Sequence, residues 1–157
     1  MIAYLSGAME NAKNEGSEWR SEITNWLKDN LHHTAINPVI ETEKLTENTE
    51  SQDYRDWKIS NPNKFKEFVR KAIDNDLNSV VNKADYLICL WNNEVLTGGG
   101  THGEVTMAYY HGKPIYLINQ LDIPNQLSGW IMSCATEMFS DFQSMQKRLT
   151  EIYGKEI

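Results

Sequence analysis

A continuous apolar run, Tyr86-Leu87-Ile88-Cys89-Leu90-Trp91, places the strongest constraint on how this chain can fold. An apolar run of this length without alternating polar residues is typical of a strand buried on both faces, as in a parallel sheet. A polar stretch follows, then the glycines at 98–100, and a helical pattern begins at Thr101 and stops near Gly112. Together with the next apolar run, 114–118, these segments predict a βαβ unit.

Glu104 lies in the predicted first turn of the helix of this unit. Ligands of such folds bind where the carboxyl ends of strands meet the amino ends of helices, so Glu104 would lie beside a ligand. A structural role competes with this one. Thr101-His102-Gly103-Glu104 fits a capping box, in which Thr101 caps the helix and Glu104 bonds back to the N–H of the cap. The glycines before the helix favour a ligand that approaches the backbone closely, and both roles stay open.

The remaining segments continue an α/β pattern in a chain of 157 residues, a length that predicts a single domain. We expect strands at 2–5, 34–37 and 137–139, a helix from Ser17 to about Asn30, a short helix within 127–132, and a last helix capped by Ser140 or Asp141.

A long helix should begin at Pro62, because its apolar residues recur at steps of three and four. The stripe consists of Phe65, Phe68, Val69, Ala72, Ile73, Leu77 and Val80, with Asp76 interrupting it. An unpaired carboxylate is expensive to bury, so Asp76 should have either a function or a cationic partner at the edge of the stripe.

Residues 41–63 differ in composition from the rest of the chain. The segment is rich in Glu, Thr, Ser and Asn and has few aliphatic residues. We expect a long polar surface insertion with room for a helical turn, of the kind that forms functional lids or mobile segments. A disordered insertion is the alternative.

Composition excludes several classes of function. The net charge is -7 and the sequence has no basic run, which argues against a nucleic-acid polymer or an anionic membrane surface as partner. The apolar runs are too short to span a bilayer, and the chain begins at once with a strand-like segment rather than a signal peptide. Cys89 and Cys134 lie in or near apolar stretches, as expected for free thiols in a reducing compartment. We therefore expect a cytoplasmic protein.

No cofactor motif is present. His102 and His111 lack the spacing of a metal site, and the glycines at 98–100 are followed by neither a P-loop lysine nor the arrangement of a dinucleotide fingerprint. We expect neither a metal nor a cofactor.

Separate motifs fall in one order: Tyr4-Leu5-Ser6-Gly7, then Asn75-Asp76-Leu77-Asn78 ahead of Ala84-Asp85, then Gly100-Thr101-His102-Gly103-Glu104 with Gly112-Lys113-Pro114. In this order and spacing they resemble the nucleoside 2-deoxyribosyltransferase family, which includes the 2'-deoxynucleoside 5'-monophosphate N-glycosidases. The stretch 125–130 also resembles a loop that, in the transferases, reaches a neighbouring subunit's site. The resemblance covers most of the chain apart from 41–63.

The resemblance implies a flavodoxin-like, or Rossmann-like, three-layer α/β sandwich with a five-stranded parallel sheet, and a homo-oligomer with shared active sites. It implies that Glu104 attacks C1' of the sugar and forms a covalent glycosyl-enzyme. Asp76 would be the acid/base or would grip the leaving nucleobase, and Tyr4 would hydrogen-bond Glu104. These roles suit glycoside cleavage with retention, which needs a nucleophilic carboxylate and a second acid/base group nearby.

Substrate contacts implied by the resemblance involve Gly7, Gly98, Gly100, Thr101, Asn125 and Ser128. Gly98 departs from the family, because the transferases have an Asp there that contacts the base and the monophosphate hydrolases have a Ser that contacts phosphate. Backbone N–H groups and threonine hydroxyls would have to replace those contacts, so the base and the need for a 5'-phosphate stay open. A non-catalytic nucleotide-binding or sensor module on the same fold is the alternative function.

Overall fold

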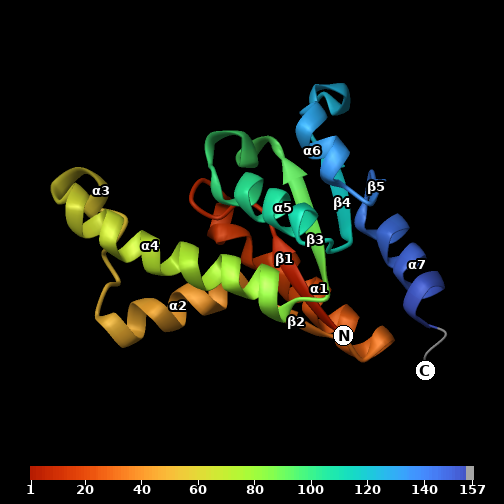
Figure 1. Cartoon of the computed structure of the whole chain (residues 1–157), viewed down its shortest axis with the longest axis horizontal. Coiled ribbons are helices and arrows are strands. Elements are labelled where there is room, and N and C mark those ends of the chain that lie inside the picture. Colours follow the sequence, from red (N-terminus) through yellow and green to blue (C-terminus); the bar gives the residue numbers. More distant parts are fainter. Residues whose placement is uncertain (155–157) are drawn as a thin grey trace.

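A five-stranded sheet, parallel throughout, forms the middle layer of the protein (Figure 1). The computed structural model describes residues 1–154. The strand order β2-β1-β3-β4-β5 is that of flavodoxin-like folds, so the predicted fold class is confirmed. The strands are β1 (Ile2–Ser6), β2 (Thr34–Ile36), β3 (Tyr86–Asn92), β4 (Ile115–Gln120) and β5 (Glu137–Phe139).

Helices cover both faces of this sheet (Figure 1). They are α1 (Ser17–Leu31), α2 (Pro38–Thr49), α3 (Trp57–Ser60), α4 (Pro62–Asn78), α5 (Gly100–Tyr110), α6 (Gly129–Cys134) and α7 (Phe142–Tyr153). α1 and α7 contribute to the hydrophobic cluster on one face. α5, α6 and the π-helical turn Ser79–Lys83 at the end of α4 contribute to the cluster on the other. None of the helices in residues 1–154 has the length and apolarity needed to cross a membrane.

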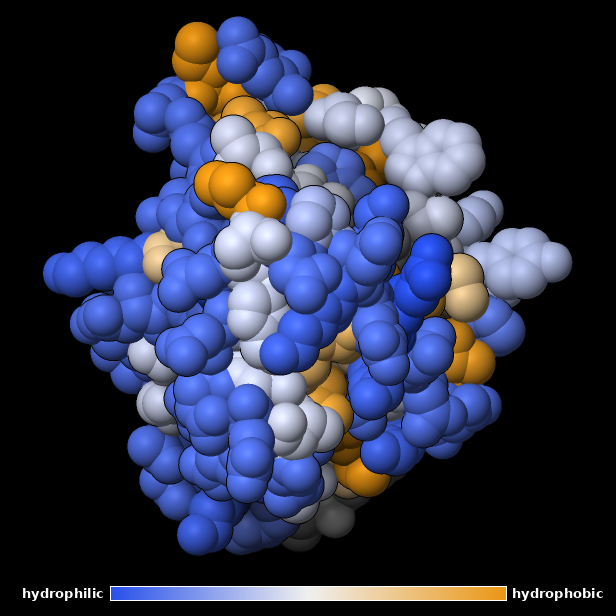
Figure 2. Space-filling model, turned by 90° about the vertical axis from the view of Figure 1, so that its left-hand side faces the viewer, coloured by the Kyte–Doolittle hydropathy of each residue, from blue (hydrophilic) through white to orange (hydrophobic). Residues whose placement is uncertain are grey.

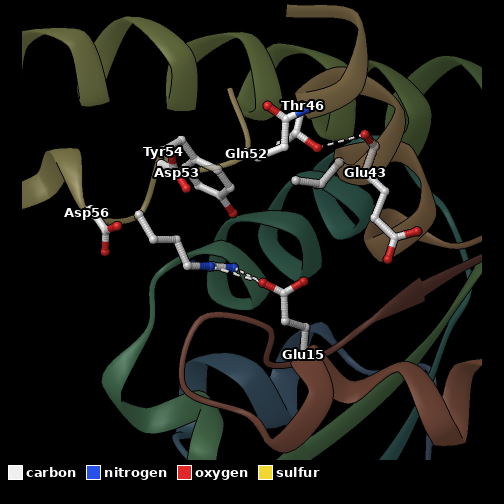
Figure 3. Close-up of a pocket in the computed structure, with 9 residues that line it drawn as sticks. Glu15, Glu43, Thr46, Gln52, Asp53, Tyr54 and Asp56 are labelled. Carbon is white, nitrogen blue, oxygen red and sulfur yellow. Dashed lines mark hydrogen bonds and ion pairs between the residues drawn. The ribbon is translucent and has the colours of Figure 1, made fainter. Parts of the chain in front are cut away.

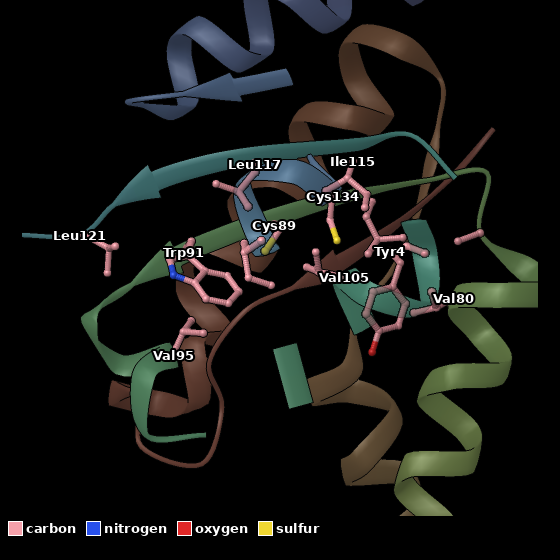
Figure 4. Close-up of a cluster of buried hydrophobic side chains, with 14 residues drawn as sticks. Tyr4, Val80, Cys89, Trp91, Val95, Val105, Ile115, Leu117, Leu121 and Cys134 are labelled. Carbon is pink, nitrogen blue, oxygen red and sulfur yellow. The ribbon is translucent and has the colours of Figure 1, made fainter. Parts of the chain in front are cut away.

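β3 is buried on both faces, as its unbroken apolar run predicts. Its alternate residues enter opposite clusters: Ile88 packs with α1 and α7, whereas Cys89 and Trp91 pack with α5 and α6. Figure 4 shows the second of these clusters under the strands. Both cysteines, Cys89 and Cys134, are buried free thiols. The central strand is therefore a rigid support for the segments that follow it.

The surface insertion predicted at 41–63 contains more helix than the single turn expected, because α2 extends to Thr49 and α3 covers Trp57–Ser60. α2 begins at Pro38, where the side chain of Asn37 accepts a hydrogen bond from the N–H of Val39 at 3.0 Å. Only the first turn of α2 is buried, so its sequence shows no apolar periodicity. Residues 50–61, which include α3, then connect α2 to α4 and are called the strap below.

Candidate active site

A cavity of about 480 Å³ lies at the carboxyl end of the sheet, beside β1 and β3. These neighbouring strands connect onward to opposite sides of the sheet, so their junction is the topological switch point at which such folds bind ligands. The β1–α1 loop, the glycines at 98–100, α4, α5 and the strap all contribute to the lining. The volume lies in the usual range for small-molecule sites.

Glu104 reaches this cavity from the second turn of α5, not from its first. The helix begins at Gly100 with Gly99 at the N-cap position, so Thr101 is already inside the helix. The N–H of Gly103 is bonded to the carbonyl of Gly99 at 3.2 Å, so the N-cap lies two residues before Thr101, the N-cap of the capping box. The predicted capping box is therefore wrong, and the carboxyl of Glu104 is free for other contacts.

The two carboxylate oxygens of Glu104 have different surroundings. The hydroxyl of Ser6 donates a hydrogen bond to Oε1 at 3.3 Å, whereas Oε2 is buried and has no hydrogen-bond partner. Burial, with a smaller contribution from the charge of Asp76, raises the pKa of Glu104 to about 8. Neighbouring Tyr4, Arg20 and Ser6 act in the opposite direction. A buried oxygen without a partner in a cavity wall is a group that a ligand can use.

Asp76 lines the same cavity, as expected from its place in the apolar stripe. Burial raises the pKa of Asp76 to about 6, against the opposing charge of Arg20. Among residues 1–154, no Lys or Arg forms an ion pair with Asp76, so the alternative of a cationic partner at the stripe's edge is wrong. Most of the stripe around it lines the cavity rather than the core: Phe65, Val69, Ala72, Ile73 and Leu77.

Tyr4 stands between the two carboxyls. Its ring is fully buried in the cluster beneath α5, next to Val80, and its hydroxyl points away from the sheet (Figure 4). This hydroxyl makes no well-formed hydrogen bond in the structure. It nevertheless lies close to both Glu104 and Asp76, and this proximity lowers the pKa of each carboxyl. Tyr4 is therefore fully buried and lies close to both carboxyls.

The predicted substrate-contact residues divide into two groups. Gly7, Gly98, Gly100 and Thr101 line the cavity. A Cβ added at Gly100 would meet no atom within 4 Å, so this glycine leaves open space rather than making a tight backbone contact. Asn125 and Ser128 lie outside the cavity lining, in the segment that precedes α6. Within one chain they do not contribute to this site.

Two ion pairs join the strap to the β1–α1 loop at the cavity. The guanidinium of Arg55 binds the carboxylate of Glu15, and the ammonium of Lys58 lies 2.9 Å from the carboxylate of Glu10. Figure 3 shows Glu15 facing the strap across a second hollow of about 330 Å³, lined partly by Tyr54.

The side that carries α2, α3 and α4 is mainly hydrophilic, with hydrophobic groups visible only in small areas (Figure 2).

Sequence reasoning missed Arg20, which is fully buried beneath the site. The buried residues of α1 are Arg20, Ile23, Leu27 and Leu31, at steps of three and four. An arginine in an otherwise apolar stripe is the same signal that drew attention to Asp76, and it was present in the sequence.

No protein-family model matches this chain, and no curated protein sequence matches it. The likeness to the nucleoside 2-deoxyribosyltransferases therefore rests on the motifs and on a shared type of fold. A fold of this type hosts many unrelated activities, so function has to be argued from the cavity and its residues.

Proposed function

We propose that this protein cleaves or transfers the N-glycosidic bond of a 2'-deoxynucleoside or its 5'-monophosphate, with Glu104 as the nucleophile. The observation that carries the proposal is that two carboxyls, Glu104 and Asp76, line one cavity with the hydroxyl of Tyr4 close to both. Retaining glycoside cleavage needs such a pair. The apolar side chains of α4 provide a wall on which the flat face of a nucleobase can rest.

In the proposed reaction a carboxylate oxygen of Glu104 attacks C1', and the bond from C1' to the base nitrogen breaks. Asp76 gives its proton to the departing base or holds that base by hydrogen bonds. The glycosyl ester on Glu104 is then attacked by water, which gives hydrolysis, or by a second base, which gives transfer. The developing positive charge on the sugar is stabilised by the carboxylate of Glu104.

The carboxyl pair must carry one proton for this chemistry. With pKa values of about 6 for Asp76 and about 8 for Glu104, the pair holds one proton between those pH values. Because Glu104 is the more deeply buried carboxyl, the shared proton resides mainly on it. Glu104 can attack the sugar only when that proton has moved to Asp76. Since the hydroxyl of Tyr4 is close to both groups, it offers a route for that transfer. The rate should therefore be bell-shaped in pH, with limbs near 6 and 8.

We also propose a homo-oligomer in which a neighbouring copy supplies Asn125 and Ser128 to the cavity. Trp130 and Met132, next to this segment, are 67% and 56% exposed. Ile131, which lies between them in the sequence, is buried. Sedimentation at micromolar concentration should show a dimer or larger species, and a monomer at all concentrations would exclude the shared site.

The proposed activity is tested by incubating the purified protein with each common 2'-deoxynucleoside and its 5'-monophosphate and measuring free base. Glu104→Gln should keep the fold and lower turnover by roughly a thousandfold or more, because the amide cannot form the glycosyl ester. Glu94→Gln is the matched control, since Glu94 also lines the cavity but is exposed, and it should retain most of the activity.

Mass spectrometry supplies the second measurement, because a slowly hydrolysed deoxynucleoside analogue should leave a sugar adduct on Glu104. A Glu104→Gln variant that remains active would exclude this nucleophile. Saturable binding of nucleosides or nucleotides without any base release would instead identify a binding module.

A further inference from the structure

Arg20 is a fully buried cation whose hydrogen bonds all go to main-chain oxygens at the end of β1 and in the loop that follows it. Its guanidinium donates to the carbonyls of Leu5, Gly7, Ala8, Glu15 and Gly16, at 2.8–3.4 Å. These bonds solvate the guanidinium but do not neutralise it. Because an uncompensated buried charge is strongly unfavourable, the fold must gain something from placing it here.

The β1–α1 loop is shaped around this guanidinium. Gly16 has a φ of +71°, and a Cβ there would lie 2.6 Å from Nη1 of Arg20. A Cβ at Gly7 would lie 3.4 Å from Nη2 and 3.0 Å from the ring of Trp19. The guanidinium also stacks over that ring, 4.7 Å from its centre. Both glycines therefore leave the space that Arg20 occupies.

This loop is part of the candidate active site. The carbonyls of Leu5 and Gly7 flank Ser6, whose hydroxyl donates to Glu104, and Gly7 and Ala8 line the cavity. We propose that Arg20 is a positioning residue: it fixes Ser6 against Glu104, and its buried charge keeps one of the two carboxyls ionised. The inference rests on the proposed function, in which those carboxyls react.

Four titratable groups lie close enough to Arg20 to affect its pKa, and only the two carboxyls among them can carry the negative charge that balances the guanidinium. These groups are Tyr4 on β1, Cys89 on β3, Asp76 on α4 and Glu104 on α5. Burial raises the pKa of Tyr4 and of Cys89, so both are neutral at physiological pH. Arg20 lowers the pKa of Asp76 and of Glu104. Without Arg20, both carboxyls would therefore titrate at higher pH.

The test separates the hydrogen bonds of Arg20 from its charge. Arg20→Lys keeps the charge but loses most of the bonds, whereas Arg20→Gln loses the charge as well. Arg148→Gln is the matched control, because Arg148 is exposed on α7 and the substitution changes the net charge equally. The readouts are kcat and KM for base release over a range of pH, with the fold checked by circular dichroism.

We expect Arg20→Lys to lower kcat about tenfold without moving the pH limbs by more than a few tenths of a unit. Arg20→Gln should lower kcat about a hundredfold or more and move both limbs up by about one pH unit, with KM changed less than kcat. Arg148→Gln should change neither. Equal losses in both Arg20 variants with unmoved limbs would show that Arg20 only stabilises the loop, and would overturn the proposal.

A measurement independent of turnover separates this inference from the proposed function. Titration of ¹³C-labelled carboxyls by NMR should show the pKa of Asp76 and of Glu104 rising in Arg20→Gln, whether or not any base is released. Unmoved carboxyl pKa values overturn the inference even if the protein is active. Should Arg20→Gln not fold, Gly16→Ala displaces the guanidinium instead, and unchanged kcat and carboxyl titration there would overturn the proposal.

Discussion

α7 and α4 carry similar apolar stripes, yet they use them differently. In α7, Met145 and Leu149 are fully buried against the sheet. In α4, Phe68 is the buried member of the stripe within the helix, and Ile73 remains 48% exposed at the cavity. Periodicity therefore predicts that a helix forms and which side is apolar, but not what that side packs against. The acidic residue within the α4 stripe is the feature that distinguishes the two helices.

The largest difference between the two helices is expected when one leucine of each apolar stripe is truncated and the losses of stability are compared. Leu149→Ala should lower the free energy of unfolding by about 3 kcal/mol, because it removes buried methyl groups and leaves a hole in the core. Leu77→Ala should cost about 1 kcal/mol, because Leu77 lines a cavity that is already open to solvent. Urea denaturation of both variants gives the comparison. Equal losses would place the α4 stripe in the core.

Glu104, on the α5 side of the sheet, and Asp141, on the α7 side, should differ in how they affect stability as the pH changes. The raised pKa of Glu104, about 8, means that the folded state binds its proton more tightly than the unfolded chain does. Folding stability should therefore fall as pH rises from about 4.5 to 8, with no loss below that window. Glu104→Gln removes this loss, so at pH 9 it should be more stable than the unmodified protein by up to about 5 kcal/mol.

Thermal melts at pH 4 and pH 9 measure this effect. The gain should be absent at pH 4, where Glu104 is protonated in both states. On the opposite face, Asp141 caps α7 by accepting a hydrogen bond from the N–H of Ser144 at 2.7 Å, and Asp141→Asn should show no such gain at pH 9. A Glu104→Gln variant that is less stable at pH 9 would mean that the carboxylate is well solvated in the fold.

A change in the wall of the cavity should affect substrate binding more than folding. Val69→Ala on α4 should raise KM several-fold, because it removes apolar contact area from the cavity, and should change the melting temperature little. Its counterpart on α7 is Ile152→Val, which touches only the core cluster on the other face and should leave KM unchanged. A KM unaffected by Val69→Ala would mean that the α4 stripe does not contact the substrate.

The smallest effect is expected at the strap. The ion pairs of Lys58 with Glu10 and of Arg55 with Glu15 are partly exposed, so each should contribute no more than about 1 kcal/mol. Lys58→Met should leave the melting temperature nearly unchanged. Because the pair closes part of the cavity wall, KM should become less sensitive to salt in this variant. An equally salt-sensitive KM would show that this ion pair does not affect substrate binding.

The sequence predicts the framework of this fold well because burial leaves a clear periodic signal. The apolar run of β3 and the stripes of α1, α4 and α7 all form the elements they indicate. α2 gave no such signal, since only Pro38 and Val39 at its start are buried. Its Asn37-Pro38 start was readable as a cap followed by a first-turn proline, but the polar composition beyond it suggested a loop.

The site was predictable in part. Asp76 and Glu104 share a cavity, as their places at the ends of two elements suggest. The local role of Glu104 could not be decided, because a capping box and a buried second-turn carboxyl share the same four residues and differ by two residues in where the helix begins. The place of Arg20 in the apolar stripe of α1 was readable from the sequence, but its hydrogen-bond partners were not, because they are main-chain carbonyls.

Both outer strands of the sheet are short, and this limits how copies of the protein can associate. β2 and β5 contain three residues each, so each edge offers few unpaired peptide groups to an incoming strand. Growth of the sheet by strand addition, the usual route to edge-to-edge aggregation, is therefore disfavoured. Copies that associate would therefore have to use helical surfaces, where side-chain fit rather than peptide hydrogen bonding selects the partner.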